Sequence, residues 1–230
     1  MNKIIAISGL KNSGKTTVAN MVAFLLNSPS WLKNYWSFKH LPQLNKRWNT
    51  VAFADTMKQM LADLLGVDKE KFEDRDFKEN TFIDLNELRM TISPSNTLSD
   101  NKFVRLVKTL DPEIKTSSLT IRQLMQMFGS NVMRQFFGDK IWINSTLNNI
   151  RQNTIISDLR FIIEEEAVHT AGGRIIYVNR PGIEPGNHAS EKEVIKLLTK
   201  NKFDAIIDND STEKELFYKV KNVLKQFNLL

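Results

Sequence analysis

A glycine-rich segment near the N-terminus has the residue types and spacing of a phosphate-binding loop. Gly9 is followed, after four residues, by Gly14, Lys15 and Thr16 within the segment SGLKNSGKTT. Glycines let backbone N–H groups turn inward around an anion, the lysine reaches the terminal phosphates of a nucleoside triphosphate, and the hydroxyl is a ligand for Mg²⁺. We therefore predict that the loop binds ATP and Mg²⁺. The predicted ligands of ATP are Lys11, Asn12, Ser13, Gly14, Lys15, Thr16 and Thr17, with Thr16 also holding the metal.

Such a loop needs a strand before it and a helix after it, and the sequence predicts both. The apolar run before the loop is one of five short runs rich in Ile, Val or Phe, none of which alternates with polar residues as a half-exposed strand would. Helical stretches separate the runs, which is typical of βαβ units. We therefore predict an α/β fold with a five-stranded, mostly parallel sheet flanked by helices. The predicted strands are 3–8, 50–53, 154–157, 174–179 and 205–208.

Capping residues and apolar spacing predict three further helices. The segment TIRQLMQMFG begins at Thr120, a good N-cap, and we expect it to end at Gly129. The next segment, SNVMRQFFG, repeats the pattern from a Ser130 cap to a Gly138 stop. The last helix lies in the C-terminal segment STEKELFYKVKNVLKQF and is capped at Ser211 or Thr212.

Two regions lack a clear period, and we interpret both as insertions in a single domain over residues 1–230. The first, 27–49, holds three of the four tryptophans. The second, 68–118, is polar and charged, and we expect it to be partly helical.

The residues that follow the predicted strands suggest what receives the phosphoryl group. In an open parallel sheet, ligands bind beyond the carboxyl ends of the strands, so these residues should share one edge with the loop. Several of them are cationic, which suits a phosphate-bearing acceptor better than water. The residues are Asp55 and Lys58 after the second strand, Asp158, Arg160 and Glu164 after the third, Arg180 after the fourth, and Asn209 and Ser211 after the fifth.

Composition excludes some classes of protein and leaves others open. The chain has no cysteine and three histidines, so disulfides and thiolate metal sites are excluded and a histidine-rich metal site is not expected. No apolar run approaches the roughly 20 residues of a membrane span. The first strand begins within three residues of the N-terminus and leaves no room for a signal peptide. The net charge of +6 is not concentrated in one block. We expect a cytoplasmic protein, in a host cytoplasm if a phage encodes it, with no membrane and no stable nucleic acid partner.

The chain resembles the bacteriophage deoxynucleoside monophosphate kinases, a branch of the P-loop nucleoside monophosphate kinase fold. The resemblance rests on the loop and on the segments FADTMKQ, IRQLMQMFGSN, IW, SDLRFIIEE, VNRPG, HASE and IIDNDSTEKEL. It implies transfer of a phosphoryl group from ATP to a deoxynucleoside monophosphate with Mg²⁺. It also implies that the loop after the last strand, with Asn209 and Ser211, holds the adenine.

The acceptor site that the resemblance implies is lined by Arg122, Gly129, Ser130, Trp142, Asp158, Arg160 and Glu164. Lys58 and Arg75 are further candidates for the acceptor phosphate. In such a site the arginines would neutralise the transferred group, so the predicted catalytic residues are Lys15, Arg122, Arg160 and Arg180. Trp142 would stack on the base, and the junction of two helices at Gly129 and Ser130 would offer free N–H groups.

Each acceptor residue also has a structural explanation. Arg122 could be a solvated helix charge, Trp142 could belong to the core, and Arg160 could form a structural ion pair. Gly129 could simply end a helix. His188 is interpreted as a surface-loop residue rather than a functional one.

Two other functions remain open from the sequence. The first is a different small-molecule kinase with the same fold, similar to dephospho-coenzyme A kinase. The second is a P-loop ATPase that acts on nucleic acid. The sequence leaves open whether the protein is a monomer or a homodimer, and which bases it accepts.

Overall fold

The structure is a computed structural model that describes residues 2–28, 47–87, 89–91, 102–110, 112, 116–186 and 189–230, without side chains at 89, 102, 103, 106 and 110. Its main feature is a five-stranded sheet with the strand order β2-β6-β1-β7-β8, in which every neighbouring pair is parallel. The strands are β1 (Ile4–Ser8), β2 (Trp48–Val51), β6 (Asn153–Leu159), β7 (Arg174–Asn179) and β8 (Ala205–Asp208). The predicted α/β class and all five predicted strands are confirmed.

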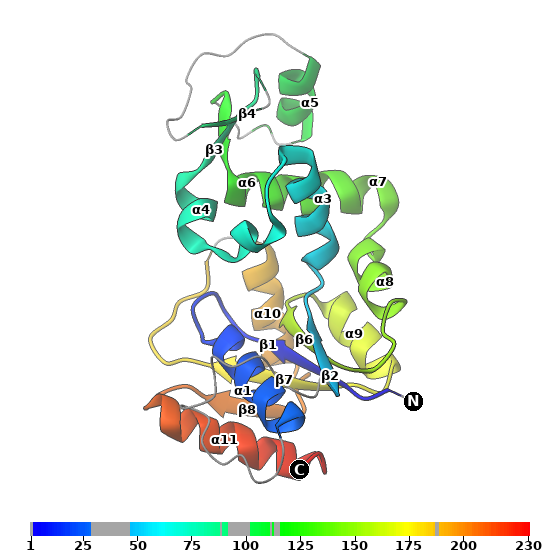
Figure 1. Cartoon of the computed structure of the whole chain (residues 1–230), viewed down its shortest axis with the longest axis vertical. Coiled ribbons are helices and arrows are strands. Elements are labelled where there is room, and N and C mark those ends of the chain that lie inside the picture. The colour runs from blue at the N-terminus through cyan, green and yellow to red at the C-terminus, as the bar shows by residue number, and fades with distance from the viewer. Residues whose placement is uncertain are drawn as a thin grey trace. The chain divides into compact units, whose positions relative to one another are not determined.

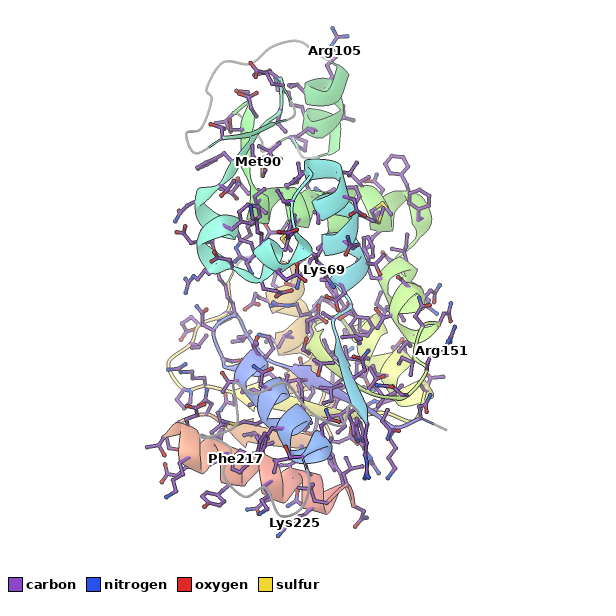
Figure 2. All side chains as sticks on the ribbon, viewed as in Figure 1. Lys69, Met90, Arg105, Arg151, Phe217 and Lys225 are labelled. Carbon is purple, nitrogen blue, oxygen red and sulfur yellow. The ribbon has the colours of Figure 1, made fainter. Side chains whose placement is uncertain are left out.

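Helices cover both faces of this sheet, which is why its central strands are apolar throughout. Successive residues of β7 point to opposite faces. Ile176 and Val178 share a buried cluster with α1 (Lys15–Asn27) and α11 (Glu213–Gln226), while Tyr177 packs with Val194 of α10 (Ala189–Thr199). Phe217, labelled in Figure 2, holds α11 to α1 through Phe24, with ring centroids 6.2 Å apart. A second helix, α9 (Ile162–Thr170), packs against β7 on the same face of the sheet as α10 (Figure 1).

The chain divides into two compact units, and each is described here by itself. The first comprises residues Met1–Phe53 and Ile143–Leu230 and contains the five-stranded sheet. The second comprises Ala54–Trp142. A short helix, α8 (Ile141–Leu147), begins in the second unit and ends in the first.

The second unit combines short helices with a small antiparallel sheet. The sheet has the order β4-β3-β5, and β3 pairs with both neighbours. The expectation that residues 68–118 are partly helical is confirmed, but the sheet was missed. The elements are α3 (Asp55–Leu65), η1 (Lys69–Glu73), α4 (Arg75–Asn80), β3 (Phe82–Asp84), β4 (Arg89–Thr91), α5 (Lys102–Leu110), β5 (Ser118–Thr120), α6 (Ile121–Gln126), η2 (Met127–Arg134) and α7 (Gln135–Phe137).

The predicted break between two helices at Gly129 and Ser130 is wrong. Thr120 caps α6 as expected, but the chain then continues through η2, a π-helical stretch, into α7 and stops only at Gly138, where φ is 91°. Gly129 therefore ends no helix. A Cβ at this position would lie 2.6 Å from the Met57 sulfur of α3, so the glycine lets the two helices approach closely. Ser130 lies inside the helix and caps nothing.

The expected cap of the C-terminal helix is confirmed, and the structure describes the two ends of the predicted insertion at 27–49. Thr212, one of the two residues expected, caps α11 through a hydrogen bond from the Glu215 N–H. Much of the predicted insertion at 27–49 lies outside the described residues, but its two ends are joined. Asn27 exchanges hydrogen bonds with the backbone of Trp48, donating at 3.0 Å and accepting at 2.8 Å. His188 also lies outside the described residues.

Within the described ranges, no helix has the length and apolar character that a bilayer crossing demands.

The carboxylate of Asp204 holds together the amino ends of β7 and β8. It accepts hydrogen bonds from Arg174 Nη1 and the Ile175 N–H, both at 2.8 Å, and lies 3.0 Å from His169 Nε2. Burial raises the pKa of Asp204, but the hydrogen bonds from Arg174, His169 and Ile175 outweigh it and hold the pKa below its usual value.

We predict that Asp204→Asn lowers the free energy of unfolding at pH 7 by about 1–3 kcal/mol, because charged hydrogen bonds are lost. The native-state pKa of Asp204 is depressed, so its contribution is present above about pH 4 and is lost as the pH falls through that pKa. Urea unfolding at pH 7 and pH 3 measures this. The difference between variant and wild type should shrink at pH 3, and an undiminished difference would contradict the prediction. Asp210→Asn, which removes an exposed carboxylate paired with Lys219, is the control and should change little at either pH.

Candidate active site

The predicted phosphate-binding loop connects β1 to α1 at the carboxyl edge of the large sheet. Ser8, the last residue of β1, pairs in register with Leu159 of β6 and with Tyr177 of β7. Because the strands are parallel, the residues that follow β6, β7 and β8 emerge at the same edge as the loop. This geometry brings Arg160 to the loop, as the sequence predicted.

Gly14 gives the loop its shape and lies against Asn209. Its φ of 97° is a left-handed conformation that favours glycine, and a Cβ there would lie 2.5 Å from the amide nitrogen of Asn209. That nitrogen donates to the Ser13 carbonyl at 2.9 Å, while the Asn209 N–H donates to the Asn179 carbonyl at 2.7 Å. The side chain of Asn209, which we expected to contact adenine, thus fastens the loop to the ends of β7 and β8. Ser211, the other expected adenine ligand, is exposed.

Lys15 is buried in the loop, with 8% of its surface exposed. Its ammonium group donates to the Leu10 carbonyl of the same loop. Burial is the largest cause that lowers the pKa of Lys15, to about 7, and the positive charge of Arg160 lowers it further. The carboxylates of Glu191 and Asp158 act in the opposite direction and raise it. The lysine, the arginine and the two carboxylates therefore form one electrostatic cluster.

Glu191 is the residue of this cluster that the sequence analysis missed. It lies in the first turn of α10 and is 4% exposed. Its carboxylate accepts from the Lys11 N–H at 3.0 and 3.2 Å and from Arg160 Nη1 at 2.6 Å. The signal was present in the sequence, because Glu191 stands three residues before the buried Val194 and so shares the apolar face of the helix.

Asp158 and Glu164 hold the backbone around Arg160. Asp158 accepts from the Phe53 N–H at 2.7 Å, which joins the carboxyl ends of β2 and β6. Glu164 is 2% exposed and accepts from the N–H groups of Arg160, at 2.8 Å, and Phe161, at 3.1 Å. Glu164 thus closes the turn that begins α9.

The remaining predicted residues of the first unit are solvent-facing to different degrees. Lys11, Asn12, Thr16 and Arg180 are exposed, Thr17 is half-buried, and Ser13 is buried with a hydroxyl that has no hydrogen-bond partner among the described residues.

In the second unit, the predicted cations lie close to carboxylates. Lys58 forms an ion pair with Glu73 at 2.5 Å, and Arg122 forms one with Glu79 at 2.7 Å. Sequence reasoning missed Lys78, whose ammonium donates to the Glu73 carbonyl at 3.1 Å. Burial lowers the pKa of Lys78, the Glu73 carboxylate raises it, and the neighbouring Arg122 and Lys58 lower it further. Lys58, Lys78 and Arg122 therefore form a cationic group. Arg75 is exposed at the start of α4 and is not part of it.

Trp142 and Gly129 are joined by a hydrogen bond in the same unit. The indole N–H donates to the Gly129 carbonyl at 3.0 Å, and 4% of the tryptophan is exposed. Trp142 has the environment of a core residue.

Comparison with known proteins gives a consistent result. A family model described as deoxynucleotide monophosphate kinase matches residues 3–220. The chain is 26% identical to the deoxynucleotide monophosphate kinase of Enterobacteria phage T4, over 97% of this chain and 99% of that protein. It is also 23% identical to a protein of Acanthamoeba polyphaga mimivirus that carries the same enzyme name provisionally, over 47% of this chain and 63% of that protein.

We predict that Gly14→Ala weakens ATP binding by about tenfold or more, because a side chain would strain the backbone and displace Asn209 from the loop. Isothermal titration calorimetry measures the affinity. Gly172→Ala is a matched control: its φ of 74° imposes a similar strain, but no atom lies within 4 Å of the new Cβ. The control should lose some stability and keep its ATP affinity. Equal ATP affinity of Gly14→Ala and wild type would sink the prediction.

Proposed function

Because the chain belongs to the deoxynucleotide monophosphate kinase family, we propose that it transfers the γ-phosphoryl group of ATP to a deoxynucleoside monophosphate, giving ADP and the diphosphate. The observation that supports this most directly is the cluster of Lys15 and Arg160 beside the phosphate-binding loop. It provides two positive charges at the edge where the parallel strands end, which is where two phosphate groups must meet.

On the donor side, the loop and Lys15 bind the phosphates of ATP. Backbone N–H groups of the loop and the N-terminal end of α1 surround the anion, and the ammonium group of Lys15 leaves the Leu10 carbonyl for the terminal phosphates. The ATP ligands that we propose are Lys11, Asn12, Ser13, Gly14, Lys15, Thr16, Thr17, Asn209 and Ser211.

We also propose Mg²⁺ as the cofactor, held by Thr16 together with the phosphates. The described residues contain no group of three or more His, Cys, Asp or Glu that could hold a metal by themselves. An exposed hydroxyl directly after Lys15 fits an ion that takes few protein ligands and several phosphate and water oxygens. When bound, Mg²⁺ would neutralise charge that develops on the phosphates.

On the acceptor side, Arg160 and the cationic group of the second unit are the proposed phosphate ligands. Arg122 and Lys58 would exchange or share their carboxylate partners when the monophosphate binds. Trp142, Gly129 and Glu164 form hydrogen bonds with neighbouring groups, so we propose that they shape the acceptor site and contribute to it through their remaining surface. The full proposed set is Lys58, Arg75, Arg122, Gly129, Ser130, Trp142, Asp158, Arg160 and Glu164.

The reaction asks the protein for alignment and charge stabilisation rather than for covalent chemistry. An oxygen of the acceptor phosphate attacks the γ-phosphorus, and the bond to the oxygen of ADP breaks. Because the attacking oxygen is already anionic, no general base is needed. Lys15, Arg122, Arg160 and Arg180 would neutralise the transferred group. We further propose that the protein acts in the cytoplasm, as a monomer or homodimer, without a stable nucleic acid partner.

We predict that ADP release, measured in a coupled assay, depends on adding at least one of the four deoxynucleoside monophosphates, and that Lys15→Ala lowers turnover by about 10²-fold or more without unfolding the protein. Lys225→Ala, which removes an exposed lysine near the C-terminal end of α11, is the control and should keep wild-type turnover. If DNA stimulates ATP hydrolysis and no monophosphate does, the protein would be better explained as a nucleic acid ATPase. If dephospho-coenzyme A stimulates ADP release, a kinase similar to dephospho-coenzyme A kinase would be favoured.

We predict that Arg160→Lys raises the KM for the monophosphate, because lysine keeps the charge but loses the planar fork of the guanidinium. ATP affinity should change little, and the Tm should stay within a few degrees of wild type. The control is Arg174→Lys, at the amino end of β7 and therefore at the opposite edge of the sheet from Arg160. Arg174 is also ion-paired, so this variant tests whether any arginine-to-lysine change at an ion pair raises the KM. If Arg160→Lys unfolds the protein while acceptor affinity per folded molecule stays normal, Arg160 is a structural residue.

A further inference from the structure

Phosphoryl transfer alone does not explain why the carboxylate of Glu191 lies beside the loop that follows β1. Glutamate is rarely buried unless it is paired, and Glu191 is 4% exposed beside a loop that we propose to bind anions. A negative charge there would repel the phosphates of ATP unless another group neutralised it. The groups that neutralise Glu191 should therefore show what it does at the site.

The contacts of Glu191 show what that function is. One carboxylate oxygen accepts from Arg160 Nη1 at 2.6 Å, and both oxygens accept from the Lys11 N–H, at 3.0 and 3.2 Å. The guanidinium, which is attached to the end of β6, is thereby tied to the backbone of the loop, which follows β1. Lys11 and Glu191 lie 180 positions apart in sequence, so this carboxylate joins distant parts of the chain.

We infer that Glu191 is a positioning residue, which fixes the guanidinium of Arg160 against the phosphate-binding loop. The acceptor and donor phosphates are thereby held in the alignment that transfer requires. The inference rests on the proposed function for its kinetic consequences. Its geometric part, the tie between Arg160 and the loop, is independent of the substrate.

Arg160 is held at both ends by buried glutamates. Its backbone N–H donates to Glu164 at 2.8 Å, and its guanidinium donates to Glu191. A free arginine side chain loses considerable rotamer entropy when a ligand immobilises it, whereas one held in advance has already lost it. Of the Arg160 side chain, 29% stays exposed, so its guanidinium keeps a surface for a ligand. A bidentate grip on a phosphate depends on such alignment.

The contrasting explanation is that Glu191 merely anchors the N-terminal turn of α10. Under that explanation, its removal would loosen the helix, and any kinetic effect would be the same whether or not Arg160 is present. The two explanations therefore differ in the coupling between Glu191 and Arg160.

The first experiment tests the tie itself with Glu191→Gln, and with Glu193→Gln as control. Glu193 lies on the same helix and pairs only with Lys196 among the contacts of the described residues, so its substitution removes a charge without touching Arg160. The probe is phenylglyoxal, which modifies accessible arginines, and peptide mass spectrometry measures the rate at Arg160. We expect Glu191→Gln to accelerate the modification about threefold or more, and Glu193→Gln to leave it unchanged. An unchanged rate in Glu191→Gln overturns the inference.

The second experiment is a double-mutant cycle of Glu191→Gln and Arg160→Ala, read in the KM for the monophosphate and in kcat. We expect Glu191→Gln to raise that KM by about tenfold with a smaller change in kcat, as for the loss of an interaction with a charged group. In the Arg160→Ala background, the same substitution should add less than about twofold. Effects that multiply would show that Glu191 acts independently of Arg160 and would overturn the positioning role.

Two checks keep the outcomes separable. If Glu191→Gln does not fold, Glu191→Asp keeps the charge but shortens the side chain by one methylene group and provides the second variant. If the wild type phosphorylates none of the four monophosphates, the proposed function fails and the positioning role falls with it. The labelling rate then still decides whether the tie exists.

Discussion

The burial of a positive charge at the carboxyl edge of a parallel sheet is the constraint on which the site depends. Lys15 lies buried in its loop, and this burial is the largest of the effects that together lower its pKa to about 7. Arg160 adds a second positive charge beside it. Without compensation, the two cations would repel each other and the lysine would tend to lose its proton. The carboxylates of Glu191 and Asp158 act in the opposite direction and offset part of this lowering, so the acids of the site favour the charged form of Lys15.

The parallel sheet is what allows these groups to meet. Lys15 follows β1, Asp158 and Arg160 lie at the end of β6, Glu191 begins α10, and the loop between them is fastened by Asn209 after β8. The strands are covered on both faces, so their ends are the exposed parts of the sheet where polar side chains can gather. The compensating carboxylates are therefore supplied by elements far apart in sequence, and no local motif contains the whole site.

This distribution explains what sequence reasoning could predict. The five strands were evident because each is a continuous apolar run, and the loop was evident because its glycines and lysine are adjacent in sequence. The small β4-β3-β5 sheet was missed because its strands are three residues long and too short to show a period. At Gly129, a plausible local stop signal was overridden by close packing of Met57, and such packing cannot be inferred from neighbouring residues. For Glu191, the spacing to Val194 indicated a buried face of the helix, but its partners Lys11 and Arg160 lie on other elements and could not be read from that spacing.

In each of the two units, cations that we propose as phosphate ligands have acidic partners. Arg160 is paired with Glu191 in the first unit, and Lys58 and Arg122 are paired with Glu73 and Glu79 in the second. If a phosphate binds to these cations as proposed, it would exchange or share ion pairs rather than create them, and its net affinity would be a difference between two favourable terms. A monoanionic ligand would gain less from such an exchange than a dianionic phosphate, because more negative charge competes better with a carboxylate. The carboxylates that hold the cations in place would then also discriminate against ligands with too little charge to displace them.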